Sequence, residues 1–574
     1  MDSLRLLLED YLSLMKEDGE LDAFVPLLLS AMGHEIIFRP QKGIRQYGVD
    51  ALSVGPDEDG TRKYFMWLIK RGAVDRTAWD AGSQSVHQSM QEVGTVHLRL
   101  HVRTEFSALP KKLVVLTNGD FSQSLEQNLK GAADDWRERF HTEIEYANGS
   151  RLARWTEKHL LNEYVLTAPS RPLFRRLLAN VDAYEVGFAA GVQFIDSLVS
   201  NARMAEGTKG AKRKRLLTIL RGIRTSLLVL YVWGLNEKNL VVPYRVTEYA
   251  VLKLWQEFHA DLLSRDADVI PEFQSVLAQL FQVAFAYHQG MWLYYQTENA
   301  FAATLGDNLL VANRVFEEIG RLGLQGTMCA FFAVSENSDL LAQRVEVYAT
   351  GLQLLLGSHS CAASPAFEHQ AVDVHAALLL LLMTGRKELA VNWVESMTMR
   401  FFRVVTGYPR FRPIAAAFDD ALLIRQGFEE PSQDFFETTI FAPILLLWTA
   451  ALGLDEAYRF LRDEVGPKLG KTSLNFWVAP ENHDSLMADG RALTSAGAGQ
   501  TPSISTLGEP EEFLQRYAQP FARLPSIENS SWHQLRAAYI PLLSALFWRL
   551  QLPREMLFKQ ALAVTRLDGV PNPD

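Results

Sequence analysis

Two short apolar runs joined by a turn-rich segment constrain the fold of this chain more than any other feature. The runs cover residues 48–54 and 64–70, and the segment 56–60 between them combines proline, glycine and acidic residues. Such a segment between two β-type runs predicts a β-hairpin. Asp50 and Lys70 then lie at the same end of adjacent strands. A carboxylate and an ammonium group held there are able to bind a divalent metal and to offset the charge of a phosphodiester.

Three segments around the hairpin add a helix and further strands in a fixed order. Residues 21–36 combine an acid-bearing helix with a glycine turn and the start of a strand. Residues 112–119 predict an apolar strand followed by polar residues. Residues 144–152 predict a last strand, followed by a turn and the start of a helix. Together with the hairpin, this order resembles the Mrr-like branch of the PD-(D/E)xK restriction-endonuclease superfamily. The resemblance covers roughly residues 1–166, less than a third of the chain.

The resemblance implies a fold and a set of functional residues. The expected fold is α/β, a restriction-endonuclease-like mixed sheet flanked by helices. The expected activity is endonucleolytic hydrolysis of DNA with Mg²⁺ or Mn²⁺. Asp50 and Lys70 are the expected catalytic residues, with Asp50 as a metal ligand and Lys70 orienting water or stabilising charge. The further expected metal ligands are Asp22, where the family helix usually has Glu, and the backbone carbonyl of Ile69.

One position departs from the family pattern and leaves an alternative open. The family has Glu or Gln two residues before the lysine, and this chain has Leu68 there. Magnesium often needs only one or two carboxylates and keeps several waters, and Glu35 and Gln41 are polar residues able to compensate. In the alternative, Leu68 marks a nuclease fold that has lost its chemistry and serves as a DNA- or protein-binding scaffold. Asp22 then only caps or solvates its helix.

Two other polar segments have both a functional and an ordinary explanation. Gln84, His87 and Gln88 follow the Lys70 strand at helical spacing, so they either approach substrate phosphate or form a solvated helix face. Residues 208–215 form the one concentrated basic run, which either contacts phosphates or is a solvated connection between helices.

Length, charge and cysteine content limit the class of protein. The chain has 574 residues, and one hydrophobic core rarely grows beyond about 250–300 residues, so we expect more than one domain. Its net charge of −10 argues against a protein that coats nucleic acid through bulk electrostatics. With only Cys329 and Cys361 there is no disulfide framework and no cysteine-based zinc site. The first residues lack the pattern of a signal peptide, and we expect a cytoplasmic protein.

The rest of the chain is predicted to be helical. Residues 167–172 contain two prolines and are expected to link the α/β domain, residues 1–166, to an all-helical domain, residues 173–574. Apolar residues then recur at three- and four-residue steps. We expect this domain to sense a trigger, bind a protein partner or mediate self-association, in keeping with bacterial defence against foreign DNA.

Two helix hairpins are predicted in that domain, over residues 372–399 and 440–465, with Gly385 and Gly453 at their turns. Helical-hairpin repeats and an irregular bundle remain alternatives. Residues 438–454 are uncharged but slightly short for a membrane span, so they predict a buried core helix and no membrane association. Residues 488–510 are rich in Gly, Ser, Thr and Pro and predict a long loop.

Overall fold

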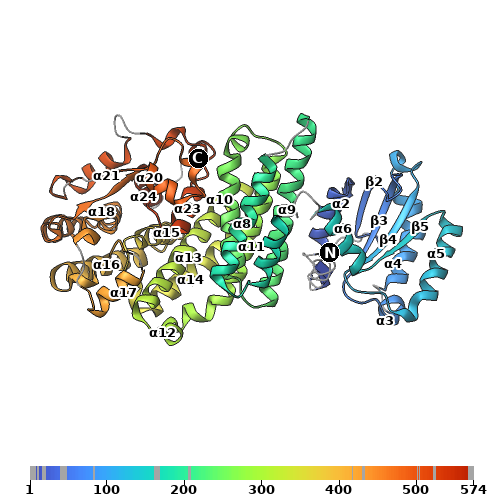
Figure 1. Cartoon of the computed structure of the whole chain (residues 1–574), viewed down its shortest axis with the longest axis horizontal. Coiled ribbons are helices and arrows are strands. Elements are labelled where there is room, and N and C mark those ends of the chain that lie inside the picture. Colours follow the sequence, from blue (N-terminus) through green and yellow to red (C-terminus); the bar gives the residue numbers. More distant parts are fainter. Residues whose placement is uncertain are drawn as a thin grey trace. The chain divides into compact units, whose positions relative to one another are not determined.

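The predicted hairpin is the centre of a five-stranded mixed sheet in the N-terminal part of the chain (Figure 1). The computed structural model describes residues 8–9, 12–13, 15, 21–38, 48–81, 85–160, 169–203, 208–416, 418–429, 433–500, 502, 504–520 and 525–566. The strands lie side by side in chain order, with β1 and β2 antiparallel, β2 and β3 antiparallel, and β3, β4 and β5 parallel. Their bounds are β1 Glu35–Phe38, β2 Ala51–Pro56, β3 Arg62–Lys70, β4 Lys111–Thr117 and β5 Glu143–Ala147.

The hairpin of β2 and β3 is buried on both faces. Residues 51–55 of β2 and 63–69 of β3 are all buried, which explains why the sequence shows continuous apolar runs instead of strict alternation. Ala51 pairs with Trp67 at one end and Pro56 with Arg62 at the other. Gly60 has a φ of 82°, a left-handed conformation that the turn requires and glycine adopts without strain.

Helices cover both faces of the sheet (Figure 1). Met66, Leu68 and Val115 belong to an apolar cluster with residues of α3 (Arg76–Asp80), α4 (Val86–Glu92), a π-helix (Val93–His101) and α5 (Glu126–Phe140). On the other face Trp67 meets Trp155 of α6 (Gly149–His159) edge-on, with ring centroids 6.2 Å apart. Helix α2 (Asp22–Ala31) packs against α6. The structure thus confirms a mixed sheet flanked by helices.

The chain divides into two compact units, Met1–Val246 and Thr247–Asp574. After the sheet, the first unit continues with α7 (Ser170–Ala179), α8 (Tyr184–Arg203), α9 (Lys209–Asn236) and the start of α10 (Val241–Leu263). The boundary between the units therefore differs from the predicted linker at residues 167–172. Residues 170–172 form the first turn of α7, and residues 167–168 lie outside the described part of the chain.

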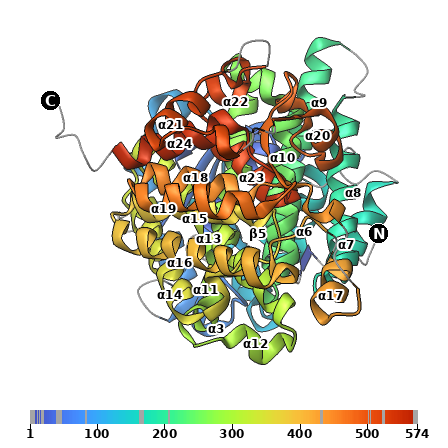
Figure 2. The ribbon, with the colours of Figure 1, turned by 90° about the vertical axis from the view of Figure 1, so that its left-hand side faces the viewer.

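The second unit is mostly helical (Figure 2). Helices α13 and α15 pack together, and α18 and α21 pack with α24. The expectation of an all-helical domain was too simple, because β6 pairs with β7 and β8 with β9. The bounds of the longer elements are α11 Val269–Gln296, α12 Ala300–Leu305, α13 Asn308–Glu336, α14 Asp339–Ser358, α15 Gln370–Met383, α16 Lys387–Gly407, α17 Phe418–Gln426, α18 Phe441–Ala451, α19 Asp455–Phe460, α20 Gly490–Ala496, α21 Pro510–Ala518, α22 Ser531–Gln534, α23 Tyr539–Trp548 and α24 Arg554–Arg566. The short strands are β6 Thr438–Thr439, β7 Ser473–Leu474, β8 Phe476–Val478 and β9 Ala498–Gln500.

Both predicted helix hairpins are present. Helices α15 and α16 are joined at Gly385 (φ 70°), and α18 and α19 are joined at Gly453 (φ 74°). Residues 441–450 of α18 are all buried, as expected for a core helix. Among the described residues, two helical stretches, Gly210–Asn236 and Val269–Gln296, are long and apolar enough to cross a membrane, by length and composition only.

The predicted loop at residues 488–510 contains a helix and a strand. Asp489 begins α20 by accepting hydrogen bonds from the backbone N–H groups of Arg491 and Ala492, at 3.1 and 3.0 Å. Strand β9 follows and pairs with β8. Loop-like composition was therefore a poor guide here, because a single capping carboxylate is enough to start a short helix.

Candidate active site

Asp50 is fastened to the strand that carries Lys70. It lies directly before β2, and its backbone N–H donates to the carbonyl oxygen of Trp67 at 2.8 Å. Its carboxylate oxygen Oδ2 accepts a hydrogen bond from the backbone N–H of Ile69 at 2.7 Å. The predicted neighbours Asp50 and Ile69 therefore meet, and the Asp50 side chain is held at the end of the hairpin away from its turn.

Lys70 ends β3 at the same edge of the sheet. Side chains alternate along a strand, so Lys70 follows Leu68 on one face of β3. Asp50 directly precedes the first paired residue of β2, Ala51, which lies opposite Trp67. Lys70 is half-buried, and its ammonium group forms no ion pair with any residue in the described ranges. Asp50 and Lys70 thus lie at the same end of the β2–β3 hairpin, and the Asp50 carboxylate is bonded to the residue before Lys70.

Asn118 holds the loop after Lys70 in place. From the sequence it was noted only as one of the polar residues that follow the third apolar run. Its Oδ1 accepts from the backbone N–H of Gly72 at 2.7 Å. Its Nδ2 donates to the carbonyl oxygens of Leu12 and Met15 at 2.7 and 3.0 Å. The buried Asn118 amide therefore links the end of β4 to the loop after β3 and to the N-terminal segment around Leu12 and Met15.

The connections after β3, β4 and β5 meet closely beside Asn118. Gly149 donates its backbone N–H to the carbonyl oxygen of Gly119 at 2.8 Å. A Cβ at Gly119 would lie 2.4 Å from the backbone of Gly72, and one at Gly149 would lie 2.7 Å from the carbonyl oxygen of Asn118. Asn148 caps α6 and donates to Asp120 at 2.9 Å. The carboxyl ends of parallel strands, where α/β proteins usually bind ligands, therefore form a compact polar edge.

The other expected metal ligand, Asp22, is the first residue of α2 and is half-buried. Helix α2 ends beside Gly33, where a Cβ would lie 3.8 Å from Pro56 at the turn of the hairpin. Asp22 lies at the opposite end of the helix, away from that turn. Among the described residues no three His, Cys, Asp or Glu side chains form a metal-binding group. The metal ligand set of Asp50, Asp22 and the Ile69 carbonyl stays a prediction.

Leu68 and Glu35 bear directly on the missing ligand. Leu68 is fully buried and belongs to the apolar cluster between the sheet and α4. Glu35 does not compensate for it, because it pairs with Val54 near the turn of the hairpin, at the opposite edge from Lys70, and forms an exposed ion pair with Arg62 at 3.6 Å. Gln41 lies outside the described residues.

The helix after β3 presents its polar residues to solvent. His87 is exposed, stacks on the buried Trp79 with ring centroids 5.8 Å apart, and lies 3.3 Å from the Asp80 carboxylate. Gln88 is also exposed, and Gln84 lies outside the described residues. Their arrangement on α4 fits a solvated helix face.

The opposite edge of the sheet holds a network of ion pairs that the sequence did not predict. Lys112 Nζ lies 3.0 Å from Asp57 Oδ2 and 2.8 Å from Glu145 Oε2. Lys63 Nζ lies 2.5 Å from Asp57 and 2.9 Å from Glu143. Burial alone would raise the pKa of Asp57, but hydrogen bonds from Lys63 and Lys112 outweigh it and lower the pKa to about 2.

Comparison of the chain with protein-family models, with curated proteins and with solved structures found no match. The candidate site is therefore defined by geometry alone. That geometry brings together Asp50, Ile69 and Lys70 at the polar edge, with Asn118 and Asn148 as residues that position the surrounding loops.

Proposed function

We propose that the N-terminal sheet is a restriction-endonuclease-like fold and that its polar edge hydrolyses DNA phosphodiester bonds. The observation that carries the proposal is the position of Asp50 and Lys70 at the same end of the β2–β3 hairpin, with the Asp50 carboxylate bonded to the backbone N–H of Ile69, the residue before Lys70. The strand order supports it, because an antiparallel hairpin is followed by two parallel strands whose ends meet at the same edge. The expected substrate is DNA in the bacterial cytoplasm, in defence against foreign DNA, by analogy with nucleases joined to helical modules.

A divalent ion bound at this edge would have few protein ligands, and water would fill most of its coordination positions. Asp50 supplies one carboxylate, and the Ile69 carbonyl and Asp22 are the candidates for further contacts. Mg²⁺ commonly binds through one or two carboxylates, with water and substrate phosphate in the remaining positions. Bound there, Mg²⁺ or Mn²⁺ would polarise the scissile phosphate and lower the pKa of water. Asp50 holds its carboxylate in place through the Ile69 N–H, and Lys70 provides a positive charge for phosphate or for the attacking water.

The test is cleavage of supercoiled plasmid DNA by the purified full-length protein with Mg²⁺, with Mn²⁺ and with EDTA. Asp50→Asn should abolish cleavage without unfolding the protein, because the amide oxygen still accepts the Ile69 N–H while the ligand charge is gone. Lys70→Met should lower the cleavage rate about 100-fold or more, as expected for loss of a charge at the reacting phosphate.

Asp135→Asn and Lys130→Met on the exposed face of α5 are matched controls and should cleave like the wild type. Cleavage that survives both Asp50→Asn and Lys70→Met would rule out this edge as the active site.

A second candidate function is a DNA- or protein-binding scaffold without catalysis. It is favoured by Leu68, which packs fully in the apolar cluster where the family supplies a metal ligand. In that case DNA should bind equally well with Mg²⁺ and with EDTA, no product should form, and Lys70→Met should weaken binding only. Gel-shift titrations beside the cleavage assay separate the two functions.

A further inference from the structure

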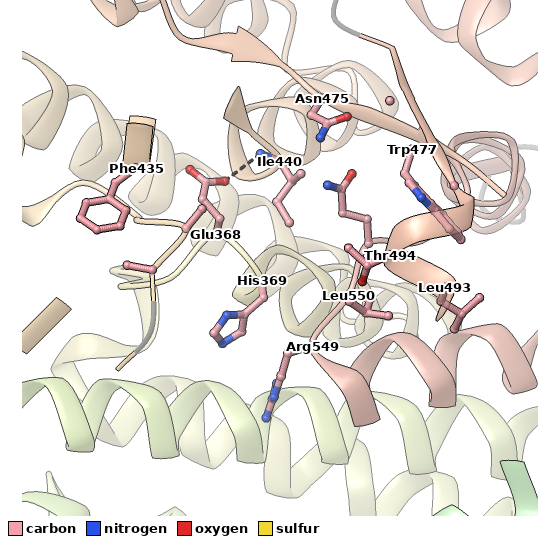
Figure 3. A pocket seen from close by; sticks show the side chains of 15 residues that line it. Glu368, His369, Phe435, Ile440, Asn475, Trp477, Leu493, Thr494, Arg549 and Leu550 are labelled. Atoms are coloured by element: carbon pink, nitrogen blue, oxygen red, sulfur yellow. Dashed lines mark hydrogen bonds between the residues drawn. The ribbon is translucent and has the colours of Figure 1, made fainter. Parts of the chain in front are cut away.

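A cavity of about 580 Å³ lies within the second unit and is lined by no residue of the candidate active site (Figure 3). Its walls come from the turn before α15, strand β8, helix α20 and the residues that follow α23. Small-molecule sites commonly have volumes of about 300–1,000 Å³, so the space is of the size that holds one ligand. Most of its lining residues are far apart in the sequence, and the fold brings them together.

The cavity is bounded by aromatic and aliphatic side chains. Phe435 and Trp477 lie on opposite sides of it in Figure 3. Gly497 passes so close to Trp477 that a Cβ there would lie 1.8 Å from the indole Nε1, so only glycine allows the chain to cross the edge of this ring. Aliphatic walls are supplied by Ile440, Leu493 and Leu550. Such walls suit a flat, apolar ring system.

Neutral polar side chains line the same space, and one of them, the Thr494 hydroxyl, already donates to the carbonyl oxygen of Gly490 at 2.8 Å. Asn475 Oδ1 is buried and has no hydrogen-bond partner among the described residues, a state that costs free energy unless a ligand supplies a donor. Burial lowers the pKa of His369 to about 3, so its imidazole is neutral at pH 7 and offers one donor and one acceptor. Gln551 adds a second amide. These groups recognise hydrogen-bonding edges instead of charges.

The acidic and the basic side chain of the lining, Glu368 and Arg549, already have hydrogen-bond partners in the protein, and burial raises the pKa of Glu368 to about 7. Glu368 accepts hydrogen bonds from the backbone N–H groups of Ile440 and Phe441, at 2.7 and 2.8 Å. Arg549 donates through Nη1 to both carboxylate oxygens of Asp373, at 2.8 and 2.9 Å. Because Arg549, the only arginine or lysine among the described lining residues, is already bound by Asp373, the cavity does not favour a ligand with several phosphates.

We propose that this cavity binds a neutral purine, as a free base or a nucleoside, with hydrogen bonds from Asn475, His369 and Gln551. Carboxamide side chains pair with the donor and acceptor atoms on a purine edge, and purine rings stack on aromatic side chains. Trp477 provides such a ring. The inference concerns the helical unit and does not depend on nuclease activity at the sheet.

Calorimetric titration of the full-length protein with adenosine and with guanosine tests the proposal. One of the two should bind with a stoichiometry of one and a dissociation constant below about 1 mM, within the range of small-ligand affinities. Asn475→Leu should weaken that binding about tenfold or more, while the melting temperature without ligand stays the same or rises, because a buried acceptor without a partner has been removed.

Gln551→Leu provides a second variant, should Asn475→Leu fail to fold, and should also weaken binding. Gln515→Leu on the exposed face of α21 is the matched control and should bind like the wild type. ATP should bind no more tightly than adenosine. The proposal is overturned if neither nucleoside binds, if the folded cavity variants bind as tightly as the control, or if ATP binds more than tenfold tighter than adenosine.

Discussion

The two edges of the N-terminal sheet use charged residues in different ways. At the turn of the hairpin, Asp57 is shared by Lys63 and Lys112, and both lysines also contact glutamates of β5. At the other edge, Asp50 accepts a backbone N–H, and Lys70 forms no ion pair within the described ranges. Strand β3 therefore carries two lysines with different roles. Lys63, near its start, stabilises the fold through ion pairs, and Lys70, at its end, forms none within the described ranges.

This difference shows where function is to be sought in the sheet. Charged groups that are paired within a network are less available to bind a ligand, whereas a half-buried ammonium without an ion-pair partner, at the same strand end as a positioned carboxylate, suits phosphate chemistry. Perturbed pKa values alone would have pointed to the edge at the turn, because the pKa of Asp57 there is lowered to about 2. Perturbation there reflects ion pairing, a common structural cause.

Removing one lysine from each edge should expose the contrast most strongly. Lys112→Met removes the buried ammonium that the half-buried Asp57 and Glu145 carboxylates share. Because Lys63 still contacts Asp57 and Arg151 still contacts Glu145, the loss of unfolding free energy should be about 3 kcal/mol, the lower end of the range for breaking a buried pair. Lys70→Met should change the unfolding free energy by less than about 0.5 kcal/mol, as for substitutions outside ion-pair networks. Urea unfolding of both variants measures the difference, and equal losses would contradict the assignment of roles to the two edges.

A second contrast lies along one face of β3, between its interior and its end. Leu68→Gln introduces the residue type that the nuclease pattern has at this position but puts an amide into the apolar cluster, at a cost of about 1–3 kcal/mol. Leu68→Met, which conserves volume, should cost less than about 1.5 kcal/mol. Thermal melting checks both values. If Leu68→Gln instead keeps the wild-type melting temperature and raises Mg²⁺-dependent cleavage, the amide has reached the metal site and the enzyme hypothesis is strengthened.

Much of the sheet was predictable because its strands carry their own signals. The hairpin followed from two apolar runs around a turn-rich segment, and its continuous hydrophobicity reflects burial on both faces. The placement of Asp50 and Lys70 at the same end of the hairpin followed from the positions of the two runs around the turn. The ion-pair network was not predictable, because it joins Asp57, Lys112 and Glu143 from three separate parts of the chain.

The helical unit shows the limits of composition as evidence. Residues 488–510 look like a loop, but Asp489 caps a helix, and Gly490 fits under Trp548, where a Cβ would lie 2.8 Å from the indole ring. The glycines that lowered the helical signal are thus required by close packing. The cavity beside them depends on residues between 368 and 551, and their approach is a property of the tertiary structure.

The pH dependence of stability provides a smaller test of the same contrast. Because the pKa of Asp57 is lowered to about 2, its contribution is fully present above the unfolded-state value near 3.8 and is lost as the pH falls from about 4 to 2. Solvent screening reduces the expected contribution to about 1 kcal/mol. The free energy of unfolding should therefore fall less between pH 5 and pH 2 in Asp57→Asn than in the wild type, as measured by urea unfolding at each pH. An unchanged pH dependence would show that the network does not hold this carboxylate ionised.

The smallest effect is expected at Glu35, which the sequence suggested as a substitute for the missing ligand at Leu68. Its ion pair with Arg62 has a distance of 3.6 Å, and both side chains are about two-thirds exposed, so Glu35→Gln should change stability by less than about 0.5 kcal/mol. Because Glu35 lies by the turn of the hairpin, the substitution should also leave any Mg²⁺-dependent cleavage unchanged, whereas Asp50→Asn should abolish it. Cleavage assays on the two variants side by side make the comparison. A loss of activity in Glu35→Gln would place metal chemistry at the ion-paired edge and reverse the assignment of the two edges.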